Sequence, residues 1–180
     1  IKILRENTFH KFPTLYKLYD TPQLHMIVYP YIKGQDIFEY YRHDLTMPEF
    51  ELQQVIYQMA ECIEHCHHIG IIHSDIKPEN FIISPSTSFQ NLKISLIDFG
   101  LSLDCSQHHP VPNEYLIGTL GYCAPDLLQG VIYKKSDILS LGCILYLLIT
   151  GYLPFSNTIR FLRKYYDDSE YLQEIKEKTI

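Results

Sequence analysis

The first part of the chain alternates hydrophobic and polar positions in a way that predicts a small β-structure. Residues 14–19 and 24–29 are rich in Leu, Ile, Val and Tyr, and a turn-forming stretch at residues 20–23 separates them. Two such runs joined by a short turn predict a β-hairpin. Gly34 then helps to break the strand pattern, and we expect a short helix over residues 35–41.

A helical repeat follows the predicted hairpin. From Thr46 to Cys66, apolar side chains recur at steps of three and four residues, which predicts an amphipathic helix. Thr46 and Glu49 fit a capping box, and Pro48 is tolerated in the first turn. Gly70 is placed to end this helix.

The next elements are predicted from short apolar runs around a polar loop. Residues 71–72 and 81–83 flank the loop, and the alternation over residues 92–96 predicts a strand that leads into Asp98. Residues 101–122 have no sustained period and are broken by Pro and Gly, so we expect a long loop that is functional or disordered.

The last clear element is a second long helix. Ser136 is expected to cap it, and it is apolar nearly all round as far as Ile149, which predicts that it is buried. Gly151 and Pro154 are placed to end it. The tail from Phe161 is again helical in pattern, with mixed charge.

Composition narrows the class of protein. The 180 residues, 46% of them hydrophobic, fit one domain, and the net charge of −6 argues against a nucleic-acid binder. Residues 138–149 are the most apolar stretch and are too short to span a bilayer. Five scattered cysteines with no C-x-x-C pair favour reduced thiols and an intracellular, cytoplasmic location. The chain begins with Ile1, so we expect it to be part of something longer.

The end of the first long helix contains residue types that can bind a metal. Cys62 and Cys66 lie one helical turn apart, and three histidines crowd the helix end at His65, His67 and His68. No partner cluster is evident in the sequence, so a helix end with a buried Cys66 is favoured over a zinc site.

The candidate chemistry lies in the polar loop. Residues 73–80 read His-Ser-Asp-Ile-Lys-Pro-Glu-Asn and contain a carboxylate, a cation and an amide oxygen. Phosphoryl transfer needs these groups: a carboxylate to orient the attacking hydroxyl, a cation near the phosphoryl group and oxygen ligands for magnesium. Asp98-Phe99-Gly100 supplies a second hard oxygen ligand after a strand, and Gly100 is expected to let the backbone turn sharply.

These residues resemble the motifs of eukaryotic-type protein kinases. Residues 73–80 are similar to the catalytic loop H-R-D-x-K-P-E-N, and residues 98–100 match D-F-G. Residues 118–126 resemble the segment G-T-x-x-Y-x-A-P-E, and residues 136–142 resemble the start S-D-x-W-S-x-G of the family's central helix. The order of the four motifs makes the resemblance specific, and it looks closest to the calcium/calmodulin-dependent kinase group.

The resemblance implies an α+β, protein-kinase-like fold in one partial kinase domain over residues 1–180. Residues 1–30 would be a remnant of the small β-lobe with its hairpin strands, and residues 31–180 the hinge and a mostly helical C-lobe. The function implied is a protein serine/threonine kinase, which uses ATP and Mg²⁺ to phosphorylate a protein substrate. The resemblance does not name a regulatory partner.

The resemblance also implies roles for individual residues. Asp75 would accept the proton of the substrate hydroxyl, Lys77 would contact the γ-phosphate and Thr119 would brace both. Magnesium would be held by Asn80 and Asp98. The remaining implied roles concern the nucleotide and the loop backbone: hinge groups toward adenine from Pro30 and Ile32, Tyr29 in the gatekeeper place, Ile82 under the adenine ring, Asp36 near the ribose or a basic substrate side chain, and His73 and Asp137 as anchors of the loop.

The chain departs from the family pattern at several points. It contains no glycine-rich phosphate loop and no V-A-I-K-type lysine. Ser74 replaces the arginine that in the family pairs with a phosphate on the activation loop, so we expect any activity to be independent of phosphorylation there. Asp126 stands for the usual Glu, and Leu139 for a usual Trp.

Two other functions remain open at this point. A pseudokinase, in which the fold serves as a binding or scaffold module, is favoured by the missing nucleotide motifs and by Ser74. The complete set of Asp75, Lys77, Asn80 and Asp98 opposes it. A small-molecule phosphotransferase of the kinase-like superfamily would lack the segment seen at residues 118–126.

Overall fold

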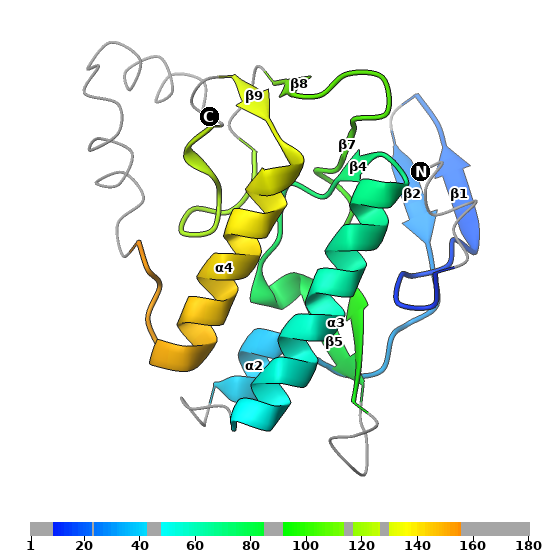
Figure 1. Cartoon of the computed structure of the whole chain (residues 1–180). Helices are drawn as coiled ribbons and strands as arrows, with labels where there is room; N and C mark the ends of the chain where they lie inside the picture. The colour runs from blue at the N-terminus through cyan, green and yellow to red at the C-terminus, as the bar shows by residue number, and fades with distance from the viewer. Residues whose placement is uncertain are drawn as a thin grey trace.

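Two long helices, α3 (Glu49–His68) and α4 (Lys134–Thr150), lie side by side and form the body of the protein (Figure 1). The structure is a computed structural model, and it describes residues 9–22, 24–42, 48–84, 92–113, 117–126 and 130–155. Short antiparallel strands pair around the two helices. The residues expected in the C-terminal helical tail lie outside the described ranges.

The predicted N-terminal hairpin is confirmed. Strands β1 (Lys17–Asp20) and β2 (His25–Val28) pair antiparallel, with Lys17 opposite Val28. Thr21 closes the turn, because its hydroxyl accepts a hydrogen bond from the backbone N–H of Leu24 at 2.9 Å. Several apolar side chains of the hairpin stay exposed, so it adds little to the core.

A three-stranded sheet supports the polar loop. Strand β5 (Phe81–Ser84) pairs antiparallel with β6 (Lys93–Leu96) on one side and with β3 (Gln35–Asp36) on the other. The apolar run at residues 81–83 and the strand predicted over residues 92–96 therefore both form strands. The short helix α2 (Ile37–Tyr41) begins later than expected, because the first two residues of that range form β3.

Helix α3 begins at Glu49, so the expected start at Thr46 is wrong. Pro48 is the N-cap, in an extended conformation with ψ 137°, and its own side chain makes no capping hydrogen bond. The carbonyl of Pro48 accepts the first helical hydrogen bond from Leu52 at 2.9 Å. Thr46 itself lies outside the described residues. The predicted end is confirmed, since Gly70 follows the helix with φ 79°.

Helix α4 also begins at a different place from the predicted one. Tyr133 is the N-cap, and Ser136 is the third helical residue, whose hydroxyl accepts a hydrogen bond from the Tyr133 N–H at 3.2 Å. Ser136 therefore caps the helix from inside its first turn. The end at Gly151, in the left-handed region with φ 75°, agrees with the prediction.

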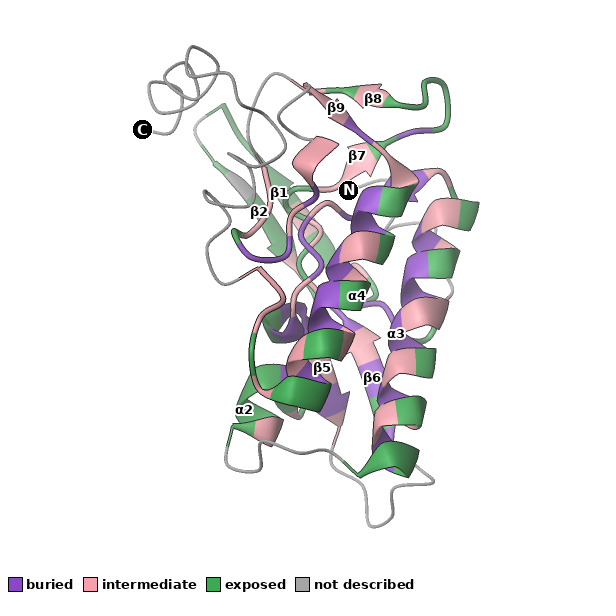
Figure 2. Cartoon of the chain, turned by 60° about the vertical axis from the view of Figure 1, so that its left-hand side comes forward, coloured by how far each residue is buried: buried purple, intermediate pink, exposed green. Residues whose placement is uncertain are grey.

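The expected burial of α4 on all sides is wrong. Parts of α4 are exposed (Figure 2). The exposed fractions are 52% for Ile138, 46% for Tyr146 and 55% for Ile149. The opposite side of α4 packs on α3 and the core through Cys143, Ile144 and Leu148. An apolar composition predicts burial only where a neighbour is present, and among the described residues the outer side of α4 has none that covers it.

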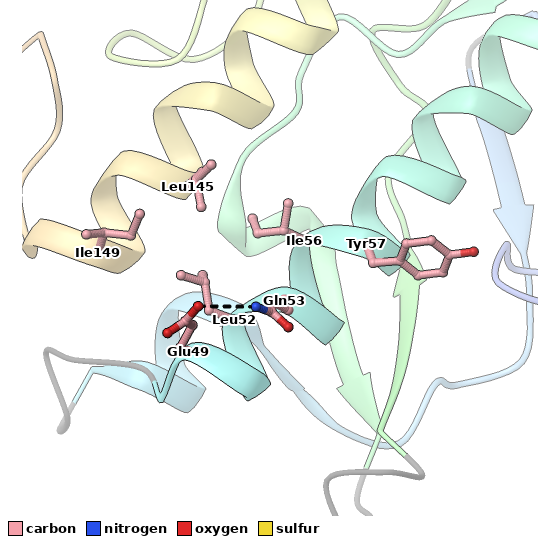
Figure 3. A pocket seen from close by; sticks show the side chains of 7 residues that line it. All are labelled: Glu49, Leu52, Gln53, Ile56, Tyr57, Leu145 and Ile149. Carbon is pink, nitrogen blue, oxygen red and sulfur yellow. Dashed lines mark hydrogen bonds between the residues drawn. The ribbon is translucent and has the colours of Figure 1, made fainter.

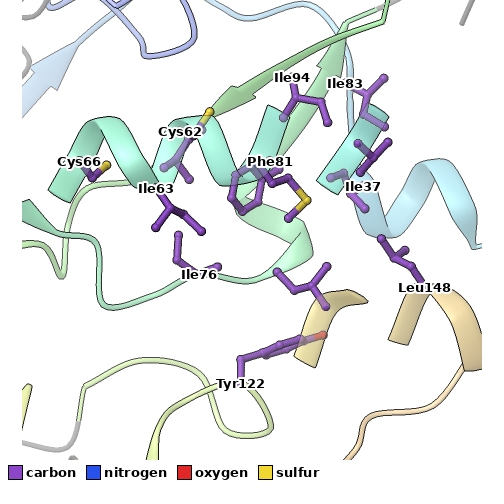
Figure 4. Close-up of a cluster of buried hydrophobic side chains, with 14 of the residues drawn as sticks. Ile37, Cys62, Ile63, Cys66, Ile76, Phe81, Ile83, Ile94, Tyr122 and Leu148 are labelled. Atoms are coloured by element: carbon purple, nitrogen blue, oxygen red, sulfur yellow. The ribbon is translucent and has the colours of Figure 1, made fainter. Parts of the chain in front are cut away.

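The main core lies between α3, the β5–β6 hairpin and the inner side of α4 (Figure 4). The predicted stripe of α3 is confirmed, with side chains that are completely buried at Val55, Met59, Cys62, Ile63 and Cys66. Each large apolar side chain buried in this way contributes about 1.5–3 kcal/mol to folding. The polar loop and Asp98 are attached directly to this rigid part of the molecule.

All five cysteines are free thiols. Cys66 is buried, as expected, and burial raises the pKa of Cys62 to about 12. In the described part of the chain, no group of three His, Cys, Asp or Glu side chains could hold a metal ion. The same ranges contain no helix with the length and apolar character needed to cross a membrane.

The loop expected over residues 101–122 contains two short strands. Strand β7 (Leu103–Asp104) pairs with β4 (Ile71–Ile72), and β8 (Val111–Pro112) pairs with β9 (Val131–Ile132). Strands of two residues are too short to show a period in the sequence. A second, smaller hydrophobic cluster lies under this loop and contains Ile72, Cys105 and Ile132.

A cavity of about 690 Å³ opens between the start of α3 and the end of α4 (Figure 3). Its walls include Leu52, Ile56, Leu145 and Ile149. The polar loop follows the opposite end of α3, so this cavity is separate from the candidate chemistry.

Candidate active site

The fold brings the two halves of the predicted site together through the β5–β6 hairpin. The polar loop enters β5 through a turn of 3₁₀-helix, η1 (Pro78–Asn80), and Asp98 follows β6. The two ends are joined directly, because the N–H of Ile97 donates to the carbonyl of Asn80 at 2.9 Å. Antiparallel pairing therefore places Asn80 and Asp98 at one end of the sheet.

Asp75 is the centre of a buried polar cluster. Its Oδ1 accepts a hydrogen bond of 2.6 Å from the Thr119 hydroxyl, and its Oδ2 forms an ion pair of 2.8 Å with Lys77 Nζ. Lys77 Nζ also donates to the Thr119 hydroxyl at 3.0 Å. Asp75 is only 7% exposed. The carboxylate, the ammonium and the hydroxyl thus fix one another, although Thr119 comes from a distant part of the chain.

The charges in this cluster stabilise each other. Burial of Asp75 raises its pKa, but hydrogen bonds from Lys77, Thr119 and Asn80 outweigh burial and hold the pKa of this carboxyl below its usual value. The hydrogen bond to Asp75 raises the pKa of Lys77. Asp75 is therefore a carboxylate, and Lys77 an ammonium, at neutral pH.

Asn80 is oriented by the same cluster. Its amide nitrogen donates to the carbonyl oxygen of Asp75 at 2.8 Å and to Asp75 Oδ2 at 3.2 Å. Asn80 is 4% exposed. Because the nitrogen is used in these bonds, the amide oxygen is the atom that Asn80 has left for a ligand.

Asp98 is exposed and lies in the left-handed region, with φ 58°. A turn follows at Gly100, as the sequence predicts, and the N–H of Ser102 closes it by donating to the carbonyl of Phe99 at 3.2 Å. Gly100 N–H donates to Asp98 Oδ1 at 3.1 Å, and a Cβ at Gly100 would lie only 3.0 Å from that oxygen. Asp98 is close enough to Lys77 to raise the pKa of the ammonium.

Phe99 anchors this turn in the core. Its ring meets the rings of Phe12 and His73 edge-on, at centroid distances of 5.0 and 5.1 Å. These contacts connect the Asp98 turn to the polar loop through apolar packing.

The backbone of the polar loop is held by Asp137 on α4. Asp137 Oδ2 accepts the N–H of His73, and Oδ1 accepts the N–H of Ser74, both at 2.9 Å. Ser74 has φ 68°, a conformation that costs energy for a residue with a Cβ. The 1% exposed carboxylate of Asp137 thus stabilises a strained backbone next to Asp75.

His73 is a second anchor of the loop. It is completely buried, and burial lowers its pKa, so that the ring is neutral. Its Nε2 donates to the carbonyl of Ile97 at 3.2 Å, and its Nδ1 accepts the N–H of Asp75 at 3.4 Å.

His67 belongs to this network and was not predicted. Its Nε2 donates to Asp137 Oδ2 at 2.9 Å, although the two residues are 70 positions apart. No local pattern could have revealed this contact.

Gly118 lets the segment before Thr119 approach the loop. It has φ 94°, and a Cβ there would lie 2.7 Å from the carbonyl oxygen of Ser74. A side chain at position 118 would therefore displace Thr119 from Asp75.

The predicted nucleotide residues are placed around β3 and β5. Pro30 and Ile32 lie in the segment between β2 and β3, and Asp36 pairs directly with Ile82 across the sheet. The Asp36 carboxylate accepts the N–H of Glu39 at 2.8 Å and caps α2. Gly34 allows the segment to pass close to β5, because a Cβ there would overlap the Ile83 carbonyl.

The chain matches the family model described as the protein kinase domain over residues 1–179. It is 34% identical to a calcium/calmodulin-dependent protein kinase type II alpha chain of Drosophila melanogaster, over 79% of this chain and 27% of the relative. It is 36% identical to CBL-interacting serine/threonine-protein kinase 24 of Arabidopsis thaliana, over 80% of this chain and 31% of the relative.

Calcium-dependent protein kinase 5 of Plasmodium berghei is 31% identical, over 87% of this chain and 27% of the relative. The chain thus spans less than a third of the length of these relatives. The motifs, the geometry around Asp75 and the match over nearly the whole chain agree. The chain belongs to the protein kinase family, in its serine/threonine branch.

Proposed function

We propose that the whole protein transfers the γ-phosphoryl group of ATP to a serine or threonine hydroxyl of a protein substrate. The observation that carries this proposal is the buried cluster in which Lys77 and Thr119 hold the Asp75 carboxylate ionised. Phosphoryl transfer depends mainly on positioning and electrostatics, and this cluster supplies both.

Asp75 is the group that orients the substrate hydroxyl. Each carboxylate oxygen can accept more than one hydrogen bond, so Oδ1 can accept a substrate O–H while it keeps the bond from Thr119. Because the pKa of Asp75 is lowered, the carboxylate is a weak base. It therefore takes the proton late, as the hydroxyl oxygen bonds to phosphorus.

Lys77 supplies positive charge beside the same carboxylate. Its side chain is partly exposed, at 22%, so its ammonium can interact with a phosphate oxygen while it remains within reach of Asp75. Thr119 keeps the two charged groups at their present separation, since its hydroxyl bonds to both.

The residues present fit ATP with magnesium. Asn80 offers an amide oxygen and Asp98 an exposed carboxylate at the same end of the sheet, and Mg²⁺ prefers one or two such ligands together with phosphate oxygens. Bound magnesium would neutralise phosphate charge. For the nucleotide we propose the backbone of Pro30 and Ile32, with Ile82 and Asp36 near the base and ribose.

The free thiols support an intracellular, cytoplasmic location for this enzyme. The pseudokinase alternative is favoured by Ser74, which removes a charge from the loop. It is opposed by the intact contacts among Asp75, Lys77, Asn80 and Thr119, because a site released from catalysis has no need to keep them.

The test is magnesium-dependent phosphorylation of a general protein substrate by the full-length protein. Asp75→Asn and Asp98→Asn should each reduce transfer by about 10²-fold or more, the size of effect expected for a positioning or charge-stabilising group. Ser74→Arg is the matched control in the same loop and should remain active. Full activity in both aspartate variants would refute the assignment, and phosphorylation of small molecules alone would refute the protein substrate.

A further inference from the structure

We infer that His109 is a positioning residue that ties the loop after Asp98 to the first turn of α4, by a contact that needs no phosphate on the loop. This inference rests on the proposed function, because its purpose is to keep the site assembled. It concerns the regulation of that site.

The tie is a hydrogen bond to a helix end. The backbone N–H of Lys134, the first residue of α4, donates to Nε2 of His109 at 3.1 Å. This N–H belongs to the first turn of a helix, where it has no partner within the helix itself. For Nε2 to accept, the His109 ring is neutral and carries its proton on Nδ1. The ring edge also meets Tyr133, with centroids 5.8 Å apart at 82°.

Backbone pairing holds the loop on both sides of His109. On one side, β7 pairs with β4, and the N–H of Cys105 donates to the carbonyl of Gly70 at 2.7 Å. On the other side, β8 pairs with β9, and the N–H of Asn113 donates to the carbonyl of Gly130 at 2.8 Å. The His109 side chain connects the middle of the loop to α4.

The point of attachment leads directly to the candidate active site. Lys134 Nζ donates to the carbonyl of His67 at 2.7 Å, and the His67 ring donates to Asp137. Asp137 in turn holds the backbone of His73 and Ser74. His109 therefore fixes the loop to the same turn of α4 that positions the neighbours of Asp75.

Ser74 explains why such a tie is needed. Its side chain is neutral, and its hydroxyl lies 3.5 Å from the carbonyl of Ile72. A neutral hydroxyl cannot form an ion pair with a loop phosphate, as an arginine would. The loop is instead held by β7, by β8 and by His109, none of which involves a modified residue.

The test compares three variants of the full-length protein. His109→Leu removes the acceptor, and His109→Gln keeps an amide oxygen at a similar reach. His108→Leu is the matched control, since the contacts belong to His109 and not to this exposed neighbour. Hydrogen exchange of the Lys134 and Asn113 amides reports the tie independently of catalysis.

His109→Leu should accelerate exchange at both amides about fivefold, the effect of losing one helix-capping acceptor. It should lower kcat/KM for a protein substrate by a similar factor and leave KM for ATP nearly unchanged. His109→Gln should restore both properties, and His108→Leu should match the wild type. Phosphatase treatment of the wild type should not reduce its activity.

The inference is overturned if His109→Leu exchanges and reacts like the wild type. It is also overturned if phosphatase abolishes activity through a phosphate mapped to residues 101–117. If the wild type shows no phosphoryl transfer at all, the proposed function fails. The exchange rates of His109→Leu and His109→Gln then still decide whether His109 ties the loop to α4.

Discussion

Replacing Asp137 by Asn should destabilise the protein and disorganise the polar loop. The carboxylate accepts three hydrogen bonds: from the N–H groups of His73 and Ser74 and from the His67 ring, all at 2.9 Å. An Asn side chain keeps one acceptor oxygen and presents an NH₂ group to at least one of these donors. A buried hydrogen bond to a charged group is worth about 1.5–3 kcal/mol, so we expect a loss of at least about 2 kcal/mol.

The measurement is urea unfolding of the full-length protein together with hydrogen exchange at the His73 and Ser74 amides. Both amides should exchange faster in Asp137→Asn, because Ser74 is strained at φ 68° and loses its support. Glu64→Gln on the exposed side of α3 is the control, and it should change the free energy of unfolding by less than about 0.5 kcal/mol. If Asp137→Asn behaved like this control in both measurements, Asp137 would not hold the loop.

Three further predictions concern the site and its supports. Thr119→Val should lower kcat by about 10–100-fold with little change in KM for ATP, because Asp75 and Lys77 lose the hydroxyl that fixes them. Thr119→Ser keeps the hydroxyl and should stay near the wild type. Steady-state kinetics test this prediction, and an unchanged kcat in Thr119→Val would contradict it. Burial lowers the pKa of His73, so the unfolded chain binds more protons than the folded one below about pH 6.5. The free energy of unfolding should therefore fall between pH 7 and pH 5, and it should fall less in His73→Gln; equal slopes in urea titrations would argue against a buried neutral ring. Gly34→Ala should lower the free energy of unfolding by at least about 1–3 kcal/mol, because its Cβ would overlap the Ile83 carbonyl. A Cβ at Gly142 would have nothing within 4 Å, so Gly142→Ala should be neutral or stabilise α4 by about 0.5–1 kcal/mol. Thermal unfolding compares the two variants, and equal effects would refute the close approach at Gly34.

Local periodicity predicted the elements that carry the core. The stripe on α3 and the alternation before Asp98 both depend on neighbours within a few residues, which a sequence displays directly. The motifs around Asp75 and Asp98 were recognised by their resemblance to those of protein kinases, and their residue types are the ones that the chemistry of phosphate and magnesium needs.

The helix starts could not be predicted in the same way. Both errors came from a polar residue that fits a capping pattern, whereas the start was fixed by backbone conformation at Pro48 and Tyr133. The left-handed conformation of Asp98, with φ 58°, was not predicted either, because glycine is the usual residue for such a conformation.

Long-range contacts were the other part that the sequence did not reveal. His67 and His109 each bond to residues at the start of α4, which are 70 and 25 positions away. Such pairs are brought together by the packing of α3 on α4 and by the pairing of β8 with β9. No single-residue pattern distinguishes them from histidines that lack such bonds.

The central claim is that Asp75, Lys77, Asn80 and Asp98 converge on one metal-bound triphosphate. Titrating the full-length, isotope-labelled protein with ATP and paramagnetic Mn²⁺ in place of Mg²⁺ tests it most directly. The NMR signals of the Asn80 side-chain amide and of the Asp98 and Gly100 backbone should broaden strongly, and those of the exposed Gln53 at the start of α3 should broaden much less. Broadening that spares Asn80 and Asp98, or that is as strong at Gln53, would contradict the account.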